Sequence, residues 1–246
     1  MTIFERLLQI KKSKGAGYFV LIDPDKWRTE QLSDVAIRAS EDGADAILVG
    51  GSLLMSSSFD ALIRLLKKKI DIPLIIFPGS QTQVSKYADA LFFLSLISGR
   101  NPSFLIGEQV RAAPVIKAFG IEAISVGYML IESGNTTSAE FMSNTRPVPR
   151  NKTDIAKATA LAAEYFGMKM VYLEAGSGAK QSVPEEMIRE VRGYISCPLI
   201  VGGGIRTPEE AHRKVQAGAS FVVTGNILEN NNKLNLVKEF AAAIHQ

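Results

Sequence analysis

The sequence predicts a single (β/α)8 barrel, a fold in which eight parallel strands alternate with helices. Its 246 residues are close to the ~250 typical of one such barrel. Short apolar runs alternate with helical segments throughout, and the runs are continuously apolar, as in parallel strands covered on both faces. Three late runs end in glycine-bearing turns, at Tyr172–Gly178, Val201–Arg206 and Thr224–Asn226, where such barrels commonly bind phosphate.

Eight apolar runs are the predicted strands. They cover Tyr18–Asp23, Ala46–Gly50, Leu74–Phe77, Ala90–Leu96, Ala123–Leu130, Met170–Glu174, Leu199–Val201 and Phe221–Thr224. Helical segments follow most of them, at Thr29–Glu41, Phe59–Lys68, Ser103–Phe119, Thr153–Phe166, Pro184–Arg192, Pro208–Ala217 and Leu234–Ile244. Start signals such as Thr207-Pro208-Glu209 and closing glycines such as Gly120 support these bounds. No linker divides residues 1–246, so we predict one catalytic domain.

Only about eleven residues, Gly79–Asp89, separate the third strand from the fourth. That length barely accommodates a helix with its loops, so we predict a modified barrel whose third helix is short or absent. The resulting gap would be flanked by apolar side chains and would admit a long apolar ligand. The flanking residues are Phe77, Phe92, Phe93, Leu96 and Ile97, although alternate strand positions also serve as ordinary core.

The connection Glu132–Lys152 after the fifth strand is long and polar, and it carries Arg146, Arg150 and Lys152. Long loops in compact domains are usually functional or mobile, and this one follows a strand at the face where barrel active sites lie. We interpret it as a lid over anionic groups, with a plain surface insertion as the alternative.

The composition excludes several classes of function. The formal net charge is +3 and the basic residues are scattered, which argues against nucleic acid as a partner. Lysine runs at 11–14 and 67–69 are interpreted as solvated helix ends. One cysteine, Cys197, fits a reducing compartment. The first residues lack the apolar run of a signal peptide, and no stretch approaches the ~20 apolar residues of a membrane span. We therefore expect a soluble cytoplasmic protein.

Carboxylates stand at two of the predicted strand ends. Asp23 ends the first strand, Asp25 follows it, and Ser52 follows the second strand. Oxygen ligands of this kind suit Mg²⁺, with capping of a following helix as the alternative role for Asp25 and Ser52. Glu174 ends the sixth strand beside the glycine turn, where a carboxylate is expected to act as a general base or to anchor a hydroxyl. Tyr172 faces the same side of that strand. The two histidines, His212 and His245, stand in positions that do not suggest catalysis.

The strand-end motifs, taken in order, resemble those of the geranylgeranylglyceryl phosphate synthase family, which includes the heptaprenylglyceryl phosphate synthases. They are LIDPDK (21–26), VGGS (49–52), FPG (77–79), SGRNP (98–102), YLEAGSG (172–178), VGGGIR (201–206) and TGN (224–226). The resemblance covers nearly the whole chain. YLEAGSG combined with DPDK and SGRNP is its most specific part.

The resemblance implies a Mg²⁺-dependent prenyltransferase of archaeal-type ether phospholipid synthesis. Such enzymes join the sn-3 hydroxyl of sn-glycerol 1-phosphate to C1 of geranylgeranyl diphosphate and release diphosphate. By the same resemblance Glu174 and Tyr172 are catalytic, and Asp23 and Ser52 bind the metal. The glycerol phosphate site would comprise Tyr172, Leu173, Glu174, Ala175, Gly176, Ser177, Gly178, Gly203, Gly204, Gly225 and Asn226.

Several alternatives stay open at this point. The prenyl substrate is geranylgeranyl diphosphate or a longer one such as heptaprenyl diphosphate, and the assembly is a homo-oligomer, dimer or hexamer. Contact with a membrane surface is expected to be transient, for release of a lipid product. A phosphosugar-metabolising isomerase is the main rival, although Asp23 lacks an acid or base partner at the fifth strand end. A non-catalytic phosphate sensor would need the glycines but not Glu174.

Overall fold

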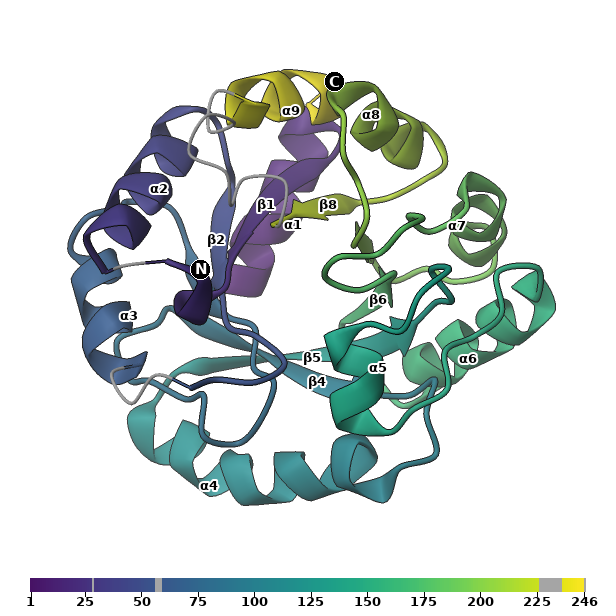
Figure 1. The fold of residues 1–246 in the computed structure, drawn as a ribbon, viewed down its shortest axis with the longest axis horizontal. Coiled ribbons are helices and arrows are strands. Elements are labelled where there is room, and N and C mark those ends of the chain that lie inside the picture. The colour runs from purple at the N-terminus through teal and green to yellow at the C-terminus, as the bar shows by residue number, and fades with distance from the viewer. Residues whose placement is uncertain (28, 56–58, 226–235, 246) are drawn as a thin grey trace.

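Eight parallel strands close into one barrel, as the sequence predicts (Figure 1). The computed structural model describes residues 1–27, 29–55, 59–225 and 236–245. Each predicted strand is found with its ends shifted by at most one residue. The strands are β1 (Gly17–Ile22), β2 (Ala46–Val49), β3 (Leu74–Ile76), β4 (Ala90–Leu96), β5 (Glu122–Leu130), β6 (Met170–Glu174), β7 (Leu199–Gly202) and β8 (Phe221–Thr224).

The helices form a ring outside the strands (Figure 1). The ring contains α2 (Thr29–Glu41), α3 (Phe59–Lys67), α4 (Glu108–Phe119), α6 (Thr153–Tyr165), α7 (Glu185–Arg192), α8 (Pro208–Gln216) and α9 (Leu236–Ile244). A 3-10 turn η1 (Pro24–Lys26) follows β1, and a π-helical turn η2 (Ser103–Gly107) leads into α4. The lysine runs lie at helix ends, as predicted. Lys11, Lys12 and Lys14 are in the last turn of α1 (Ile3–Lys14), and Lys67 ends α3 with Lys68 and Lys69 directly after it.

The ring is interrupted between β3 and β4. Residues 77–89 are all described, and none of them is helical, which confirms the predicted modification of the barrel. The chain instead runs as an irregular segment whose Gln81 N–H donates to the Glu108 carboxylate of α4 at 2.7 Å. The wall of the barrel is therefore covered only by loop and by α4 at this position.

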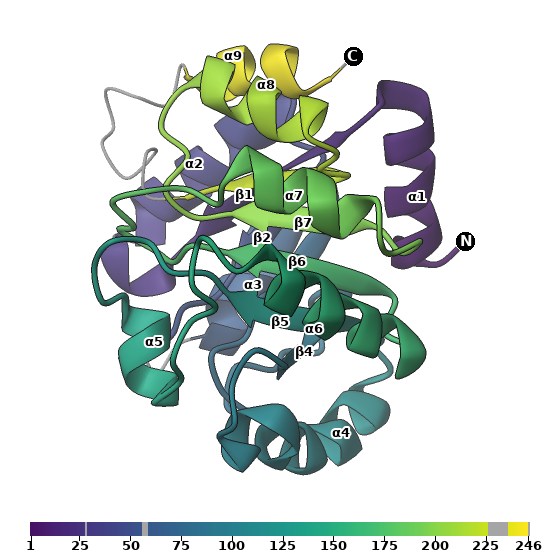
Figure 2. The same ribbon diagram turned by 90° about the vertical axis from the view of Figure 1, so that its right-hand side faces the viewer.

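Helix α1 covers the N-terminal end of the barrel, at the far side from the short helix α5 (Ser138–Ser143) (Figure 2). Its Leu7 is fully buried in the cluster of side chains that fills the barrel interior. The carboxylate of Glu122, at the start of β5, accepts from the Ile3 and Phe4 N–H groups, which satisfies donors of the first helical turn. Helix α5 was not predicted, and α1 was predicted only as a helix end at residues 11–14, without bounds.

Aromatic side chains fill the barrel interior between α1 and the C-terminal strand ends. Phe19 and Phe221 stack with ring centroids 4.8 Å apart, and Phe92 lies 6.4 Å from Phe19. Nearer the C-terminal ends, Phe77 contacts both Tyr128 and Tyr172. This packing closes the N-terminal end of the barrel to solvent. Any ligand must therefore enter at the C-terminal ends of the strands or through the gap in the helical ring.

Candidate active site

A polar cavity of about 390 Å³ lies at the C-terminal ends of the strands. Its wall is built from most of the strand ends that the sequence singles out. Lining residues from the predicted site are Asp23, Ser52, Tyr172, Glu174, Ser177, Gly178, Gly203, Gly204 and Gly225. Leu173 and Ala175 pack instead in the outer core between strands and helices, so only their main chains can meet a ligand. Asn226 lies outside the described residues.

Glu174 is held in the cavity wall as a buried carboxylate, with the residue only 5% exposed. One oxygen, Oε1, accepts from the Gly176 N–H at 2.5 Å. Burial raises the pKa of the Glu174 carboxyl above its ordinary value, although the bond from Gly176 and the neighbouring Tyr172 hydroxyl work in the opposite direction. Because a raised pKa makes a carboxylate a better proton acceptor near neutral pH, this environment suits a general base.

The Tyr172 hydroxyl lies beside Glu174 and is fully buried. It makes no hydrogen bond of ordinary geometry with a described protein group, and burial together with the Glu174 charge raises its pKa. Gly202 leaves the room for it, because a Cβ there would collide with the Tyr172 oxygen. A buried hydroxyl without a firm partner on the wall of a polar cavity is suited to bind a hydroxyl of a ligand.

The glycine turns after β6 and β7 meet beside the cavity with left-handed backbones, and Gly203 and Gly204 line it whereas the predicted Gly176 does not. Gly176, Gly203 and Gly204 have φ of 100°, 82° and 72°, values that glycine adopts without the strain that a side chain brings. A Cβ on Gly203 would meet Glu174 Oε1, and it would lie 2.5 Å from the Gly176 nitrogen. The two turns thus approach each other so closely that only glycine fits. Main-chain N–H groups gathered in this way can bind an anion.

The ends of β1 and β2 contribute oxygen atoms on the other side of the cavity. A Cβ on Gly51 would lie 3.2 Å from the Asp23 carboxylate, so the glycine lets that carboxylate approach the Gly50–Ser52 turn. Lys26 Nζ lies 3.9 Å from Asp23 Oδ2 and donates to Ser177 Oγ at 3.4 Å. Among the described residues no group of three His, Cys, Asp or Glu forms a metal cluster. The Asp23 carboxylate and the Ser52 hydroxyl are oxygen ligands of the kind that Mg²⁺ prefers, and substrate and water would have to complete the donor set.

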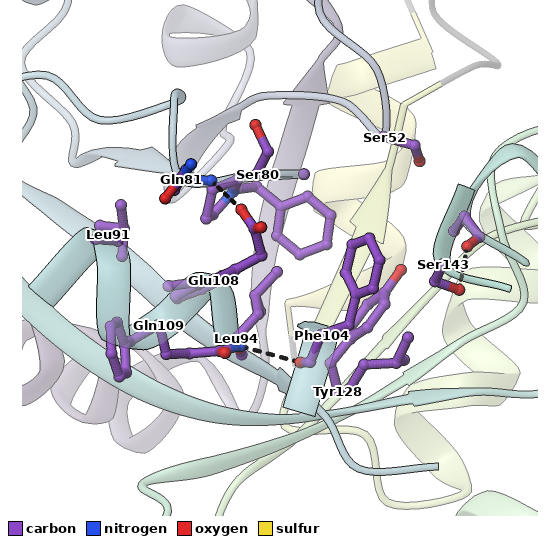
Figure 3. A pocket seen from close by; sticks show the side chains of 18 of the residues that line it. Ser52, Ser80, Gln81, Leu91, Leu94, Phe104, Glu108, Gln109, Tyr128 and Ser143 are labelled. Carbon is purple, nitrogen blue, oxygen red and sulfur yellow. Dashed lines mark hydrogen bonds between the residues drawn. The ribbon is translucent and has the colours of Figure 1, made fainter. Parts of the chain in front are cut away.

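An apolar groove joins the polar cavity where the helical ring is interrupted (Figure 3). Phe77 and Tyr128 line both spaces, and their rings are 5.8 Å apart. Phe92, Phe93 and Leu96 line the groove as predicted. The prediction was wrong for Ile97, which is not a lining residue and which packs near Gly127 under α6.

The long loop after β5 lies over the mouth through α5, whose Ser138 and Ala139 line the polar cavity. Asn101 of the SGRNP motif holds this helix by donating to the Ser143 carbonyl at 2.7 Å. The basic residues of the loop are not among the lining residues. Arg150 instead donates to the carbonyls of Glu132 and Ser182, because its side chain turns toward α7 and α8. The expected lid is present as a covering helix, without its cations over the cavity.

Two residues of the site carried no signal in the sequence. Gln83, 1% exposed, pairs its side-chain amide with the main chain of Gly51, accepting from N–H at 3.3 Å and donating to the carbonyl at 2.8 Å. Gln109 donates from α4 to the carbonyls of Leu94 and Phe104 and so fixes one wall of the groove (Figure 3). Both are single amides that no motif surrounds, and their contacts come from distant segments.

Fold and site together define an enzyme of the (β/α)8 class that acts on a phosphorylated small molecule. A glycine-lined anion cradle adjoins a buried carboxylate at the C-terminal strand ends, where the active sites of such barrels lie. An apolar groove extends the site sideways.

Comparison with known proteins identifies the particular family. Residues 8–244 match the PcrB family, so the chain belongs to it. A geranylgeranylglyceryl phosphate synthase of Chitinophaga pinensis is 47% identical over 96% of this chain and 93% of its own. The enzyme of that name from Methanothermobacter marburgensis is 48% identical over 88% of each chain.

Solved structures agree with this assignment. A (S)-3-O-geranylgeranylglyceryl phosphate synthase of Thermoplasma acidophilum, in complex with its substrate sn-glycerol-1-phosphate, superposes with a TM-score of 0.95 at 37% identity and covers 100% of this chain and 99% of its own. An N-acetylmannosamine-6-phosphate 2-epimerase of Clostridium perfringens shares the fold alone, at 17% identity. No helix in the described part of the chain has the length and apolar character needed to cross a membrane.

Proposed function

We propose that the chain is a geranylgeranylglyceryl phosphate synthase, which joins the sn-3 hydroxyl of sn-glycerol 1-phosphate to C1 of geranylgeranyl diphosphate. One observation carries the proposal. The cavity places an anion cradle and the buried Glu174 carboxylate at one end of a continuous space, and an apolar groove at the other end. A small phosphorylated polyol and a long apolar tail can therefore meet in a single site.

The glycerol phosphate would bind at the β6 to β8 side of the cavity. Its phosphate lies against the main chains of Ser177, Gly178, Gly203 and Gly204, with Gly225 beside them, while the Gly176 N–H stays bonded to Glu174. Tyr172 donates to a glycerol hydroxyl and orients it. Glu174 takes the proton of the attacking hydroxyl, and its raised pKa suits that step. Orientation of a weak nucleophile is itself a large part of the rate enhancement.

The diphosphate of the second substrate would bind at the β1 and β2 side. Asp23 and Ser52 would hold Mg²⁺, which when bound neutralises the charge that develops on the departing diphosphate. Lys26 lines the same wall and adds a positive charge there. The prenyl tail then lies in the groove past Phe77 and Tyr128. A longer substrate such as heptaprenyl diphosphate uses the same polar end and differs only in the length of groove it fills.

We also propose that residues 1–246 form one catalytic domain that works as a cytoplasmic homo-oligomer, dimer or hexamer, with transient membrane contact for release of product. Exposed apolar side chains on η2 and α4, Ile106 at 59% and Val110 at 63%, support an interface between subunits. The single cysteine fits a reducing compartment.

The test is direct turnover. The purified chain is incubated with Mg²⁺, sn-glycerol 1-phosphate and labelled geranylgeranyl or heptaprenyl diphosphate, and an organic-extractable product is measured after dephosphorylation. We expect product with at least one of the two diphosphates and a loss of product in chelator. Absence of product with every prenyl diphosphate would refute the proposal. Conversion of phosphosugars in that case would support the isomerase interpretation.

A further inference from the structure

We propose that Glu210 and Ser182, which lie outside the cavity lining of the predicted site, position the phosphate cradle by joining its two glycine turns. Glu210 belongs to α8 and Ser182 to the segment between β6 and α7. The inference rests on the proposed function, since it assigns these residues to glycerol phosphate binding.

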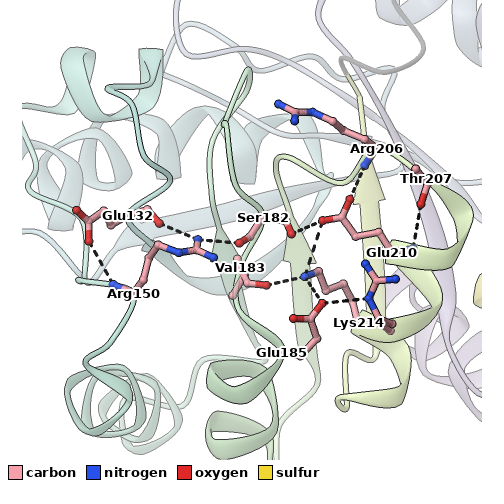
Figure 4. Close-up of polar contacts among 10 residues, drawn as sticks. Glu132, Arg150, Ser182, Val183, Glu185, Arg206, Thr207, Glu210 and Lys214 are labelled. Carbon is pink, nitrogen blue, oxygen red and sulfur yellow. Dashed lines mark hydrogen bonds and ion pairs between the residues drawn. The ribbon is translucent and has the colours of Figure 1, made fainter.

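A direct side-chain bond connects the two turns. Ser182 Oγ donates to Glu210 Oε1, and the Arg206 N–H, two residues after Gly204, donates to Glu210 Oε2 at 2.9 Å (Figure 4). One carboxylate therefore holds the segment after β6 with one oxygen and the segment after β7 with the other. Bonds to a carboxylate are stronger than neutral ones, so this link fixes the spacing of the two segments.

The main chains touch next to this link. A Cβ on Gly204 would lie 3.0 Å from the Ser182 nitrogen and 3.1 Å from the Gln181 carbonyl carbon. The Gly204 turn is thus packed against the Ser182 segment with no room for a side chain between them. A change of a few tenths of an ångström in this contact is transmitted to the N–H groups of the cradle, because the backbone between them is short.

The start of α1 offers an internal comparison. There Thr2 and Glu5 form a reciprocal capping box, in which the Glu5 carboxylate returns to the Thr2 N–H at 2.8 Å. In α8, Thr207 caps the Glu210 N–H in the same way. The Glu210 carboxylate, however, binds the Arg206 N–H and the distant Ser182. The Glu210 carboxylate therefore connects two segments that are 28 residues apart in the sequence. In an ordinary capping box it would bind only an N–H group of its own helix.

Lys214 makes a second connection between the segment after β6 and α8. Its side chain is 2% exposed, and Nζ donates to the Val183 carbonyl and to Glu185 Oε1, both at 2.7 Å, with Glu210 Oε1 at 4.0 Å (Figure 4). A buried ammonium group must be compensated, and here both compensating carboxylates lie at the starts of α7 and α8. The Ser182–Glu210 bond is therefore held in place by a second bridge between the same helices.

The test compares Glu210→Ala, Glu210→Gln and Ser182→Ala with the parent in steady-state kinetics and in calorimetric binding of sn-glycerol 1-phosphate. We expect Glu210→Ala and Ser182→Ala to raise the KM and Kd for glycerol 1-phosphate by about tenfold, the scale of one lost bond to a charged group. The KM for the prenyl diphosphate should change by less than about threefold. Glu210→Gln should recover most of the affinity, because its amide can accept from Arg206 and donate to Ser182.

Glu164→Ala is the matched control, since it removes a carboxylate that also binds a serine hydroxyl and main-chain N–H groups, those of Ser196 and Cys197. These bonds lie at the opposite end of β7, so its glycerol 1-phosphate KM should match the parent. The inference is overturned if Glu210→Ala and Ser182→Ala leave that KM within twofold, or raise both substrate KM values equally. Should Glu210→Ala fail to fold, Ser182→Ala decides. An inactive parent would instead refute the proposed function.

Discussion

Replacement of Glu174 by glutamine separates charge from shape at the centre of the site. The Gly176 N–H donates to Glu174 Oε1 at 2.5 Å, and a glutamine oxygen can accept the same bond. The change therefore preserves the turn after β6 and removes only the negative charge and the ability to accept a proton. We expect turnover to fall by about 10²-fold or more, the scale of general-base catalysis, while the Kd for glycerol 1-phosphate changes little.

The same variant should be more stable than the parent at neutral pH. Burial raises the pKa of the Glu174 carboxyl above its ordinary value of 4.5, so the folded state favours the protonated form. That contribution to stability is fully present below the unfolded pKa and is lost as the pH rises through the folded pKa. Glutamine stays neutral throughout. The difference in Tm between variant and parent should therefore grow from about pH 4.5 upward and then level off.

Two measurements check this reasoning together: single-turnover kinetics with both substrates, and calorimetric unfolding between pH 4 and pH 8. Unchanged turnover would remove Glu174 from the chemistry. A Tm for Glu174→Gln below that of the parent at pH 8 would contradict the expectation that the buried negative charge destabilises the parent. Loss of glycerol 1-phosphate binding in step with turnover would mean that the carboxylate anchors the substrate and does not act as its base.

Four further substitutions test other parts of the molecule. Gly203→Ala should raise the KM for glycerol 1-phosphate at least tenfold, because φ is 82° there and a side chain in that region costs about 1–2 kcal/mol before any clash. Gly225→Ala should raise this KM much less, since its Cβ would only approach a carbonyl oxygen to 3.1 Å. Equal effects of the two substitutions would contradict the geometry. Asp23→Asn should weaken the Mg²⁺ dependence of turnover and leave glycerol 1-phosphate binding intact, so parent activity that persists in chelator would exclude the metal role. Asp45→Asn should lower the free energy of unfolding at pH 7 by about 1–3 kcal/mol. Burial alone would raise the Asp45 pKa, but bonds from His245 and two other donors bring it below its ordinary value of 3.8. In urea unfolding the effect should therefore begin to shrink below about pH 3.8 and be lost as the pH falls through the lower folded pKa.

The strands, and the strand ends that line the cavity, could be predicted from the sequence because each is a local pattern. A run such as Met170–Glu174 is continuously apolar up to the residue that faces the cavity, and burial on both faces leaves such a run few other structures. The glycines of the cradle carry their own signal, since a left-handed backbone selects that residue type.

The remaining features depend on contacts between distant segments. Gln83 and Ser182 are ordinary polar residues in irregular segments, and only the folded chain brings them to Gly51 and to Glu210. Helix α1 has a recognisable capping box, but no local sequence pattern predicts that this helix lies across the end of the barrel. Helix α5 has six residues in a polar loop, too short for an apolar period to emerge.

The absence of a helix between β3 and β4 affects how far the polar end and the apolar end of the site can vary independently in sequence. In the proposed function, the tail of the prenyl diphosphate would leave the barrel sideways, between β3 and α4, while its charged head would stay at the strand ends. Residues of the side wall, such as Phe93 and Phe104, line the groove and not the polar cavity. On that proposal, a substitution there should alter which tail is accommodated and leave proton transfer and anion binding unchanged. The gap would then allow tail length and reaction chemistry to vary separately, so that relatives could diverge in one while they share the other.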